Sequence, residues 1–177
     1  PTTVSNDYTI ALELWNNHKS SKMEKKEFDR IEKQWQYLNE PPLGHYADFE
    51  FRLTEIPTFG KGTTIRVFLK DSVATFMMRE VGKNWIVINK QFRSQNYWNQ
   101  FNEKLETLFW QQPTHSLEPV TISDGTSYYF EGITPDRKYS IYRHPGSEYS
   151  KLISQFYLPL IIQFRCGSAQ KKKLDCS

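Results

Sequence analysis

Three residues near a predicted strand end, Glu131, Arg143 and His144, have side chains that could do chemistry together. A carboxyl group, a guanidinium and an imidazole would supply an acid, an anion clamp and a titratable base. Residues 127–133 and 138–143 are predicted to form a hairpin, which could bring Glu131 opposite Arg143 or Lys138. We favour the simpler interpretation of a cross-strand ion pair, because such pairs are common on sheet surfaces and contribute little to stability. We therefore assign no catalytic residue.

A hydrolase acting on cell walls or other glycans is the enzymatic alternative. Such an enzyme would pair Glu131 with a second carboxylate such as Asp124, Asp136 or Glu148. The two groups would have to lie ~5–9.5 Å apart across a cleft at the strand ends. We favour a protein without catalytic activity over this alternative.

No local motif predicts a metal site or a cofactor. The four histidines, His18, His45, His115 and His144, are isolated, and none is four residues from another or near a C-x-x-C pair. The chain has no G-x-S-x-G nucleophile motif and no glycine-rich phosphate loop. We predict neither a metal nor a cofactor.

The only two cysteines, Cys166 and Cys176, enclose a short polar segment near the C-terminus. Such a segment buries too little apolar surface to order itself, so we predict that the two cysteines form a disulfide. Closing a loop of about ten residues contributes roughly 3 kcal/mol in the chain-entropy account. A disulfide indicates an oxidising compartment, so we expect a periplasmic or secreted protein whose leader has been removed.

Composition predicts a folded protein that does not bind nucleic acid. The 177 residues include 5 Trp, 10 Tyr and 12 Phe, far more large rings than a disordered chain carries. The net charge of +3 arises within residues 165–177, and the rest of the chain is balanced. The most apolar run, residues 156–164, is too short to cross a membrane.

The hydrophobic pattern predicts an α+β fold. We expect one domain over residues 1–177, with a helical segment at 1–40, a core at 45–164 and a basic, disulfide-closed tail at 165–177. The core is predicted to be an antiparallel meander sheet of about seven strands with helices packed on one face. Helices are expected over 21–38, from Ser94 to about 112, and from about 147 to Pro159, which should kink or stop the last one. The expected strands are 49–54, 64–70, 73–79, 85–89, 120–123, 127–133 and 138–143.

The favoured function is binding of another protein by a small exported domain, in the manner of an inhibitor or an immunity protein. Aromatic and methionine side chains on the sheet are the candidate contacts: Phe68, Met78, Tyr129 and Tyr142. A carrier of a small apolar ligand is a further alternative. The sequence does not determine the oligomeric state, nor whether the N-terminal helices pack on their own core or swap between protomers.

Overall fold

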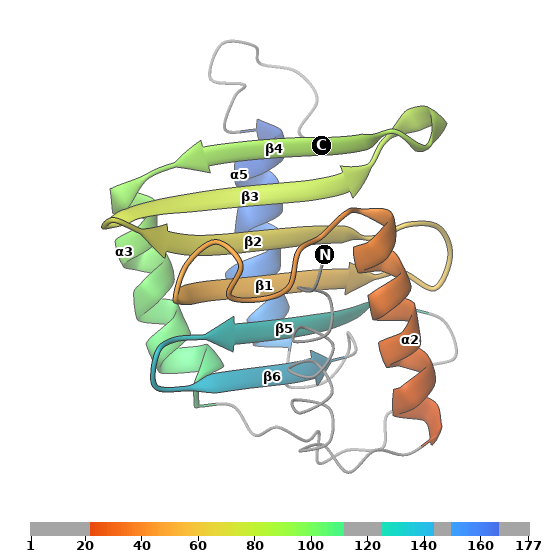
Figure 1. Ribbon diagram of the computed structural model, residues 1–177, viewed down its shortest axis with the longest axis horizontal. Helices are drawn as coiled ribbons and strands as arrows, with labels where there is room; N and C mark the ends of the chain where they lie inside the picture. Colours follow the sequence, from red (N-terminus) through yellow and green to blue (C-terminus); the bar gives the residue numbers. More distant parts are fainter. Residues whose placement is uncertain (1–21, 112–124, 144–149, 167–177) are drawn as a thin grey trace, which may run out of the picture.

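A six-stranded antiparallel sheet with helices on both of its faces forms the fold (Figure 1). The structure is a computed structural model and describes residues 22–111, 125–143 and 150–166. Because the sheet is antiparallel and the helices pack on its faces, the predicted α+β class is confirmed. The predicted strand 120–123, the first part of the N-terminal helical segment and most of the basic tail lie outside the described residues.

The sheet combines a meander with a returning hairpin. Its strands are β1 (Phe49–Ile56), β2 (Thr63–Lys70), β3 (Val73–Val81), β4 (Val87–Arg93), β5 (Ser127–Ile133) and β6 (Lys138–Arg143). They lie in the order β4-β3-β2-β1-β5-β6. The first four form the predicted meander, but β5 pairs with β1, with Thr54 opposite Tyr129. The meander therefore does not run through all six strands.

One face of the sheet carries the main hydrophobic core. Alternate residues of the strands, such as Phe51, Leu53 and Phe130, point into it and are fully buried. Helix α3 (Gln95–Lys104) covers part of this face and continues into a π-helical turn, Leu105–Phe109. Ser94 caps α3 as predicted, accepting a hydrogen bond from the backbone N–H of Tyr97 at 3.2 Å.

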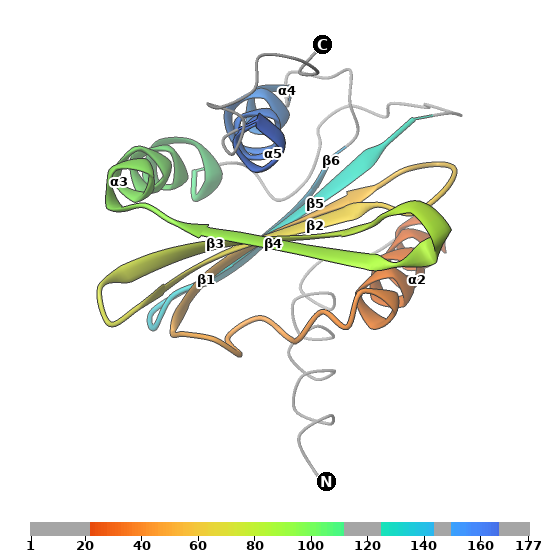
Figure 2. The same ribbon diagram turned by 90° about the horizontal axis from the view of Figure 1, so that it is seen from above.

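The C-terminal helix covers the rest of the core face (Figure 2). It consists of α4 (Ser150–Leu152), a π-helical turn (Ile153–Tyr157) and α5 (Leu158–Cys166). Of the two predicted effects of Pro159, a kink or a stop, the stop is excluded, since the chain stays helical to Cys166. The π-helical turn ends at Tyr157, directly before α5, and Pro159 lies in the first turn of α5, where a missing N–H is tolerated.

Helix α2 (Lys22–Tyr37) packs against the opposite face of the sheet (Figure 2). Phe28, Ile31 and Trp35 form a second, smaller core with Ile56 and Tyr129. The predicted stripe of α2 is therefore buried against its own chain. The helices on one face are α3, α4 and α5, and α2 adds a layer on the other.

None of the helices in the described parts of the chain has the length and apolar character that crossing a membrane requires.

Gly62 permits a close approach of the β1–β2 connection to α2. A Cβ atom there would lie 1.8 Å from the backbone oxygen of Glu55 and 2.7 Å from the amide oxygen of Gln34. Gly62→Ala is therefore expected to lower the free energy of unfolding by about 1–3 kcal/mol, measured by urea denaturation. Lys61→Ala, at the neighbouring exposed position, is the control and should lose less than about 1 kcal/mol, since its ammonium contacts only the ring of Tyr37 and, more distantly, that of Trp85. Equal midpoints for the two variants would contradict the prediction.

Candidate functional site

Glu131, the predicted acid, is buried on the face that α2 covers. Its carboxylate accepts a hydrogen bond from Nε of Arg52 at 2.7 Å, and both side chains are almost fully buried. In the strand register Glu131 lies opposite Ser140, Arg143 lies opposite Tyr128, and Lys138 lies opposite Ile133. The expected partners of Glu131 are thus wrong, because its ion pair is made with β1 on the other side of β5. His144 lies outside the described residues.

Glu131 and Arg52 belong to a larger group of buried ionic side chains, which we name the buried charge cluster. Arg66 donates through Nε to Glu40 at 2.7 Å, and through Nη1 to Glu50. Arg79 donates to the other oxygen of Glu40 at 3.0 Å. The cluster consists of Glu40, Glu50, Arg52, Arg66, Arg79 and Glu131. Its three arginines balance its three glutamates.

The buried charge cluster fastens the connection between α2 and β1 to the sheet. Glu50 accepts hydrogen bonds from the backbone N–H groups of Gly44 and Ala47, both at 2.9 Å, and of Tyr46. Arg66 donates to the backbone oxygen of Pro42 at 3.0 Å and to that of Pro41. Every carboxylate of the cluster is thus occupied by a cation, by backbone groups or by both. This arrangement suits a structural role, because buried charges are tolerated when they are paired.

Aromatic rings close the cluster beneath α2. The guanidinium of Arg52 lies 3.6 Å from the ring centre of Trp35, whose indole N–H donates to Oγ1 of Thr54 at 2.9 Å. Burial lowers the pKa of Arg52, but the charge and hydrogen bond of Glu131 outweigh it and raise that pKa overall. Burial, with Glu131 nearby, also raises the pKa of Tyr129. Arg52 therefore stays charged, and the phenol of Tyr129 stays neutral.

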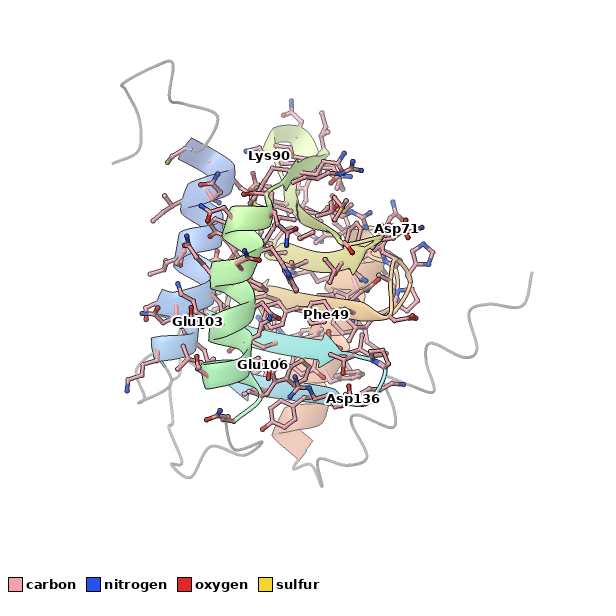
Figure 3. All side chains as sticks on the ribbon, turned by 90° about the vertical axis from the view of Figure 1, so that its left-hand side faces the viewer. Phe49, Asp71, Lys90, Glu103, Glu106 and Asp136 are labelled. Atoms are coloured by element: carbon pink, nitrogen blue, oxygen red, sulfur yellow. The ribbon has the colours of Figure 1, made fainter. Side chains whose placement is uncertain are left out.

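In the described parts of the chain, the carboxylates proposed for a hydrolase do not lie together in one cleft. Asp136 lies on the exposed turn between β5 and β6 (Figure 3), where its side chain accepts a hydrogen bond from Thr134 at 2.5 Å. Glu131, in contrast, is buried and paired with Arg52. Asp124 and Glu148 lie outside the described residues. No observation in the described parts of the chain supports Glu131 and Asp136 acting together as general acid and general base.

The four predicted binding residues are mostly inside the protein. Met78 is fully buried in the main core, and Tyr129 is buried beneath α2. Phe68 is covered by the ring of Tyr46, which stacks on it at a centroid distance of 4.8 Å. Tyr142 is partly buried against the smaller core. These burial values do not favour a binding surface made of these residues.

An exposed apolar surface lies instead at one end of the sheet. The connections β1–β2 and β3–β4 both turn at this end, near the C-terminal end of α2 (Figures 1 and 2). Phe59 is 84% exposed, Trp85 is 65% exposed and Ile86 is 63% exposed. We name this region the tip surface, and it comprises Tyr37, Phe59, Lys61, Trp85 and Ile86.

Trp85 is held in a defined position within the tip surface. The hydroxyl of Tyr37 donates to the backbone oxygen of Trp85 at 3.0 Å, and the two rings meet edge to face at 6.4 Å. The ammonium of Lys61 lies 3.8 Å from the ring centre of Tyr37 and 5.4 Å from that of Trp85. One side chain from α2 and one from the β1–β2 connection thus lie against this exposed indole.

The backbone at Trp85 adopts a conformation that bulky residues rarely take. Asn84 and Trp85 have φ angles of 58° and 63°, in the left-handed region. For residues other than glycine this conformation costs roughly 1–3 kcal/mol, and it concentrates at functional sites. The hairpin is closed by a hydrogen bond from the N–H of Gly82 to the backbone oxygen of Ile86 at 2.8 Å. In this turn the side chains of Trp85 and Ile86 are exposed to solvent.

Sequence reasoning missed the tip surface because it assigned Trp85 to the start of a strand. The available signal was an adjacent Trp and Ile directly after the turn residues Gly82, Lys83 and Asn84, where polar side chains are usual.

Comparison with protein-family models and with curated protein sequences finds no match to this chain. Within the described ranges, no three His, Cys, Asp or Glu side chains lie close enough together to hold a metal ion. Cys166 ends α5, whereas Cys176 lies outside the described residues, so the disulfide stays a prediction.

Proposed function

We propose that this protein is an exported, non-catalytic domain that binds another protein through its tip surface. The observation that carries the proposal is Trp85, which is exposed and yet fixed in a strained backbone conformation. Exposed tryptophans on rigid elements are typical anchors of protein interfaces, because little side-chain freedom is lost on binding. Export is supported by the predicted pairing of Cys166 with Cys176.

The surroundings of Trp85 support a binding role over a role in folding. Phe59 and Ile86 add apolar area to the same end of the sheet, and both side chains are largely exposed. Exposed apolar side chains that gather in one place mark interaction sites more often than scattered ones do. The alternatives of a glycan hydrolase and of a ligand carrier have no comparable support in the described parts of the chain.

Trp85→Ala is expected to weaken binding of the partner strongly. The purified chain and the variant would be immobilised and exposed to an extract of the source organism's envelope, with captured proteins identified by mass spectrometry. The identified partner would then be purified and titrated by calorimetry. We expect its Kd to rise at least about 30-fold with the variant, since truncating such an anchor costs about 2 kcal/mol or more.

Ile162→Ala is the matched control, because Ile162 is a similarly exposed apolar residue on α5. It should leave the Kd of the partner unchanged, and both variants should melt like the parent. A partner lost with Ile162→Ala but kept with Trp85→Ala would place the interface on α5 and refute the tip surface. Failure of the intact chain to capture any protein would count against a binding function altogether.

A further inference from the structure

The tip surface carries positive charge without negative charge. The connection 57–62 contains Lys61, and neither it nor the connection 82–86 contains Asp or Glu. No carboxylate of the described residues forms an ion pair with Lys61, whereas the cations of the buried charge cluster all have carboxylate partners. Lys61 therefore presents an unbalanced charge beside the exposed apolar side chains.

The ammonium of Lys61 also lies against aromatic rings of the tip surface. Its ammonium rests on the face of the Tyr37 ring at 3.8 Å, and Tyr37 itself is hydrogen-bonded to the backbone of Trp85. Any partner that covers the indole of Trp85 must therefore also remove water from the neighbouring ammonium. Burying an ammonium without a counter-charge is strongly unfavourable, so a partner of this surface has to supply an anionic group there.

We propose that the partner is a protein whose binding face offers an Asp or Glu carboxylate to Lys61, next to an apolar pocket that receives Trp85. This inference rests on the proposed function and specifies the chemistry of the partner. Opposed charges of this kind also speed association and reject competing basic surfaces.

An anionic membrane surface is the other partner that matches lysines beside exposed apolar rings. The geometry of Trp85 favours a protein. A fluid bilayer interface accepts an indole in many orientations, so it has no need of a left-handed backbone or of the hydrogen bond from Tyr37. A shaped pocket does need such a fixed orientation.

Random dodecamer peptides displayed on phage provide a probe that does not depend on the natural partner. Peptides would be selected on the intact chain and counter-selected on Trp85→Ala. We expect the survivors to be enriched in Asp or Glu adjacent to apolar residues. Synthetic versions should bind Lys61→Gln at least about tenfold more weakly than the parent, and raising NaCl from about 50 to 500 mM should weaken only the parent's binding.

Lys70→Gln is the control, because Lys70 is an exposed lysine at the opposite end of β2. It should bind the selected peptides like the parent. Peptides that require Trp85 but lack acidic residues and bind Lys61→Gln normally would refute the carboxylate inference and leave the proposed function standing. If the counter-selection on Trp85→Ala removes every selected peptide, binding does not depend on Trp85, and both the inference and the proposed function would be refuted.

Vesicles of phosphatidylglycerol and phosphatidylcholine test whether a membrane lipid, in place of a protein carboxylate, supplies the anionic group for Lys61. We expect no sedimentation of the chain with them. Sedimentation that depends on both Trp85 and Lys61, without any acidic peptide being selected, would overturn the inference in favour of a membrane surface.

Discussion

Arg66→Ala is expected to lower the free energy of unfolding by about 3–5 kcal/mol. Arg66 is fully buried and is the ion-pair partner of both Glu40 and Glu50, which are themselves almost inaccessible to water. Removing the guanidinium leaves two carboxylates in the interior without their shared counter-charge. It also removes hydrogen bonds to the backbone oxygens of Pro41 and Pro42. The loss would be measured by urea denaturation, followed by tryptophan fluorescence.

Two further variants, a control and a conservative substitution, test this expectation. Arg137→Ala breaks a much more exposed ion pair, with Glu106, and a contact of the guanidinium with the Trp110 ring at 4.1 Å, so it should cost about 1–2 kcal/mol. Arg66→Lys keeps the charge but lacks the planar fork of donors, and it should fall between the parent and Arg66→Ala. If Arg66→Ala does not fold, the intermediate stability of Arg66→Lys still tests the argument. Equal stability of Arg66→Ala and Arg137→Ala would contradict a buried charge cluster that fastens the segment before β1.

Phe51→Ala is expected to destabilise the fold by about 3–5 kcal/mol, because it leaves a cavity at the centre of the main core. Phe51 is fully buried on β1. Its ring meets those of Phe101 at 5.4 Å, Phe109 at 5.1 Å and Phe156 at 5.7 Å. One side chain thus joins the sheet to α3, to the turn that follows it and to the C-terminal helix. Thermal and urea denaturation would measure the loss.

The same substitution at Phe59 is the matched control. Phe59 is the most exposed of the large apolar side chains in the described parts of the chain, so Phe59→Ala should change stability by less than about 0.5 kcal/mol. Phe51→Leu retains most of the apolar volume and should be milder than Phe51→Ala. A loss with Phe59→Ala as large as that with Phe51→Ala would contradict the assignment of the core.

The elements of the fold could be predicted because their signals are local. Alternation in residues 49–54 correctly places Phe51 and Leu53 on one face and Arg52 on the other. The hydroxyl of Ser94 was recognisable as a cap from its position before the apolar stripe of α3. The pairing of β5 with β1 was not recognisable, because it joins residues such as Thr54 and Tyr129, which lie far apart in the sequence.

That distant pairing also explains the wrong partner for Glu131. Sequence reasoning considered only β6, which follows β5 directly, and could not know that Arg52 of β1 lies on the other side. Phe68 was predicted as a candidate contact residue of the sheet. It is buried because the segment before β1 folds back and places Tyr46 over it, an arrangement that no local periodicity encodes.

The position of β1 between β2 and β5 has a consequence for how the chain folds as it is synthesised. A ribosome completes β2 directly after β1, but β5 begins only at Ser127. At about 5–20 residues per second, one edge of β1 stays without a neighbour for several seconds, with Phe51 and Leu53 beside it. An unpaired apolar edge can recruit strands from other nascent chains. Fragments of the chain that end before Ser127 therefore leave this edge of β1 unpaired. We expect such fragments to aggregate more readily than the full chain, in which β5 covers the edge.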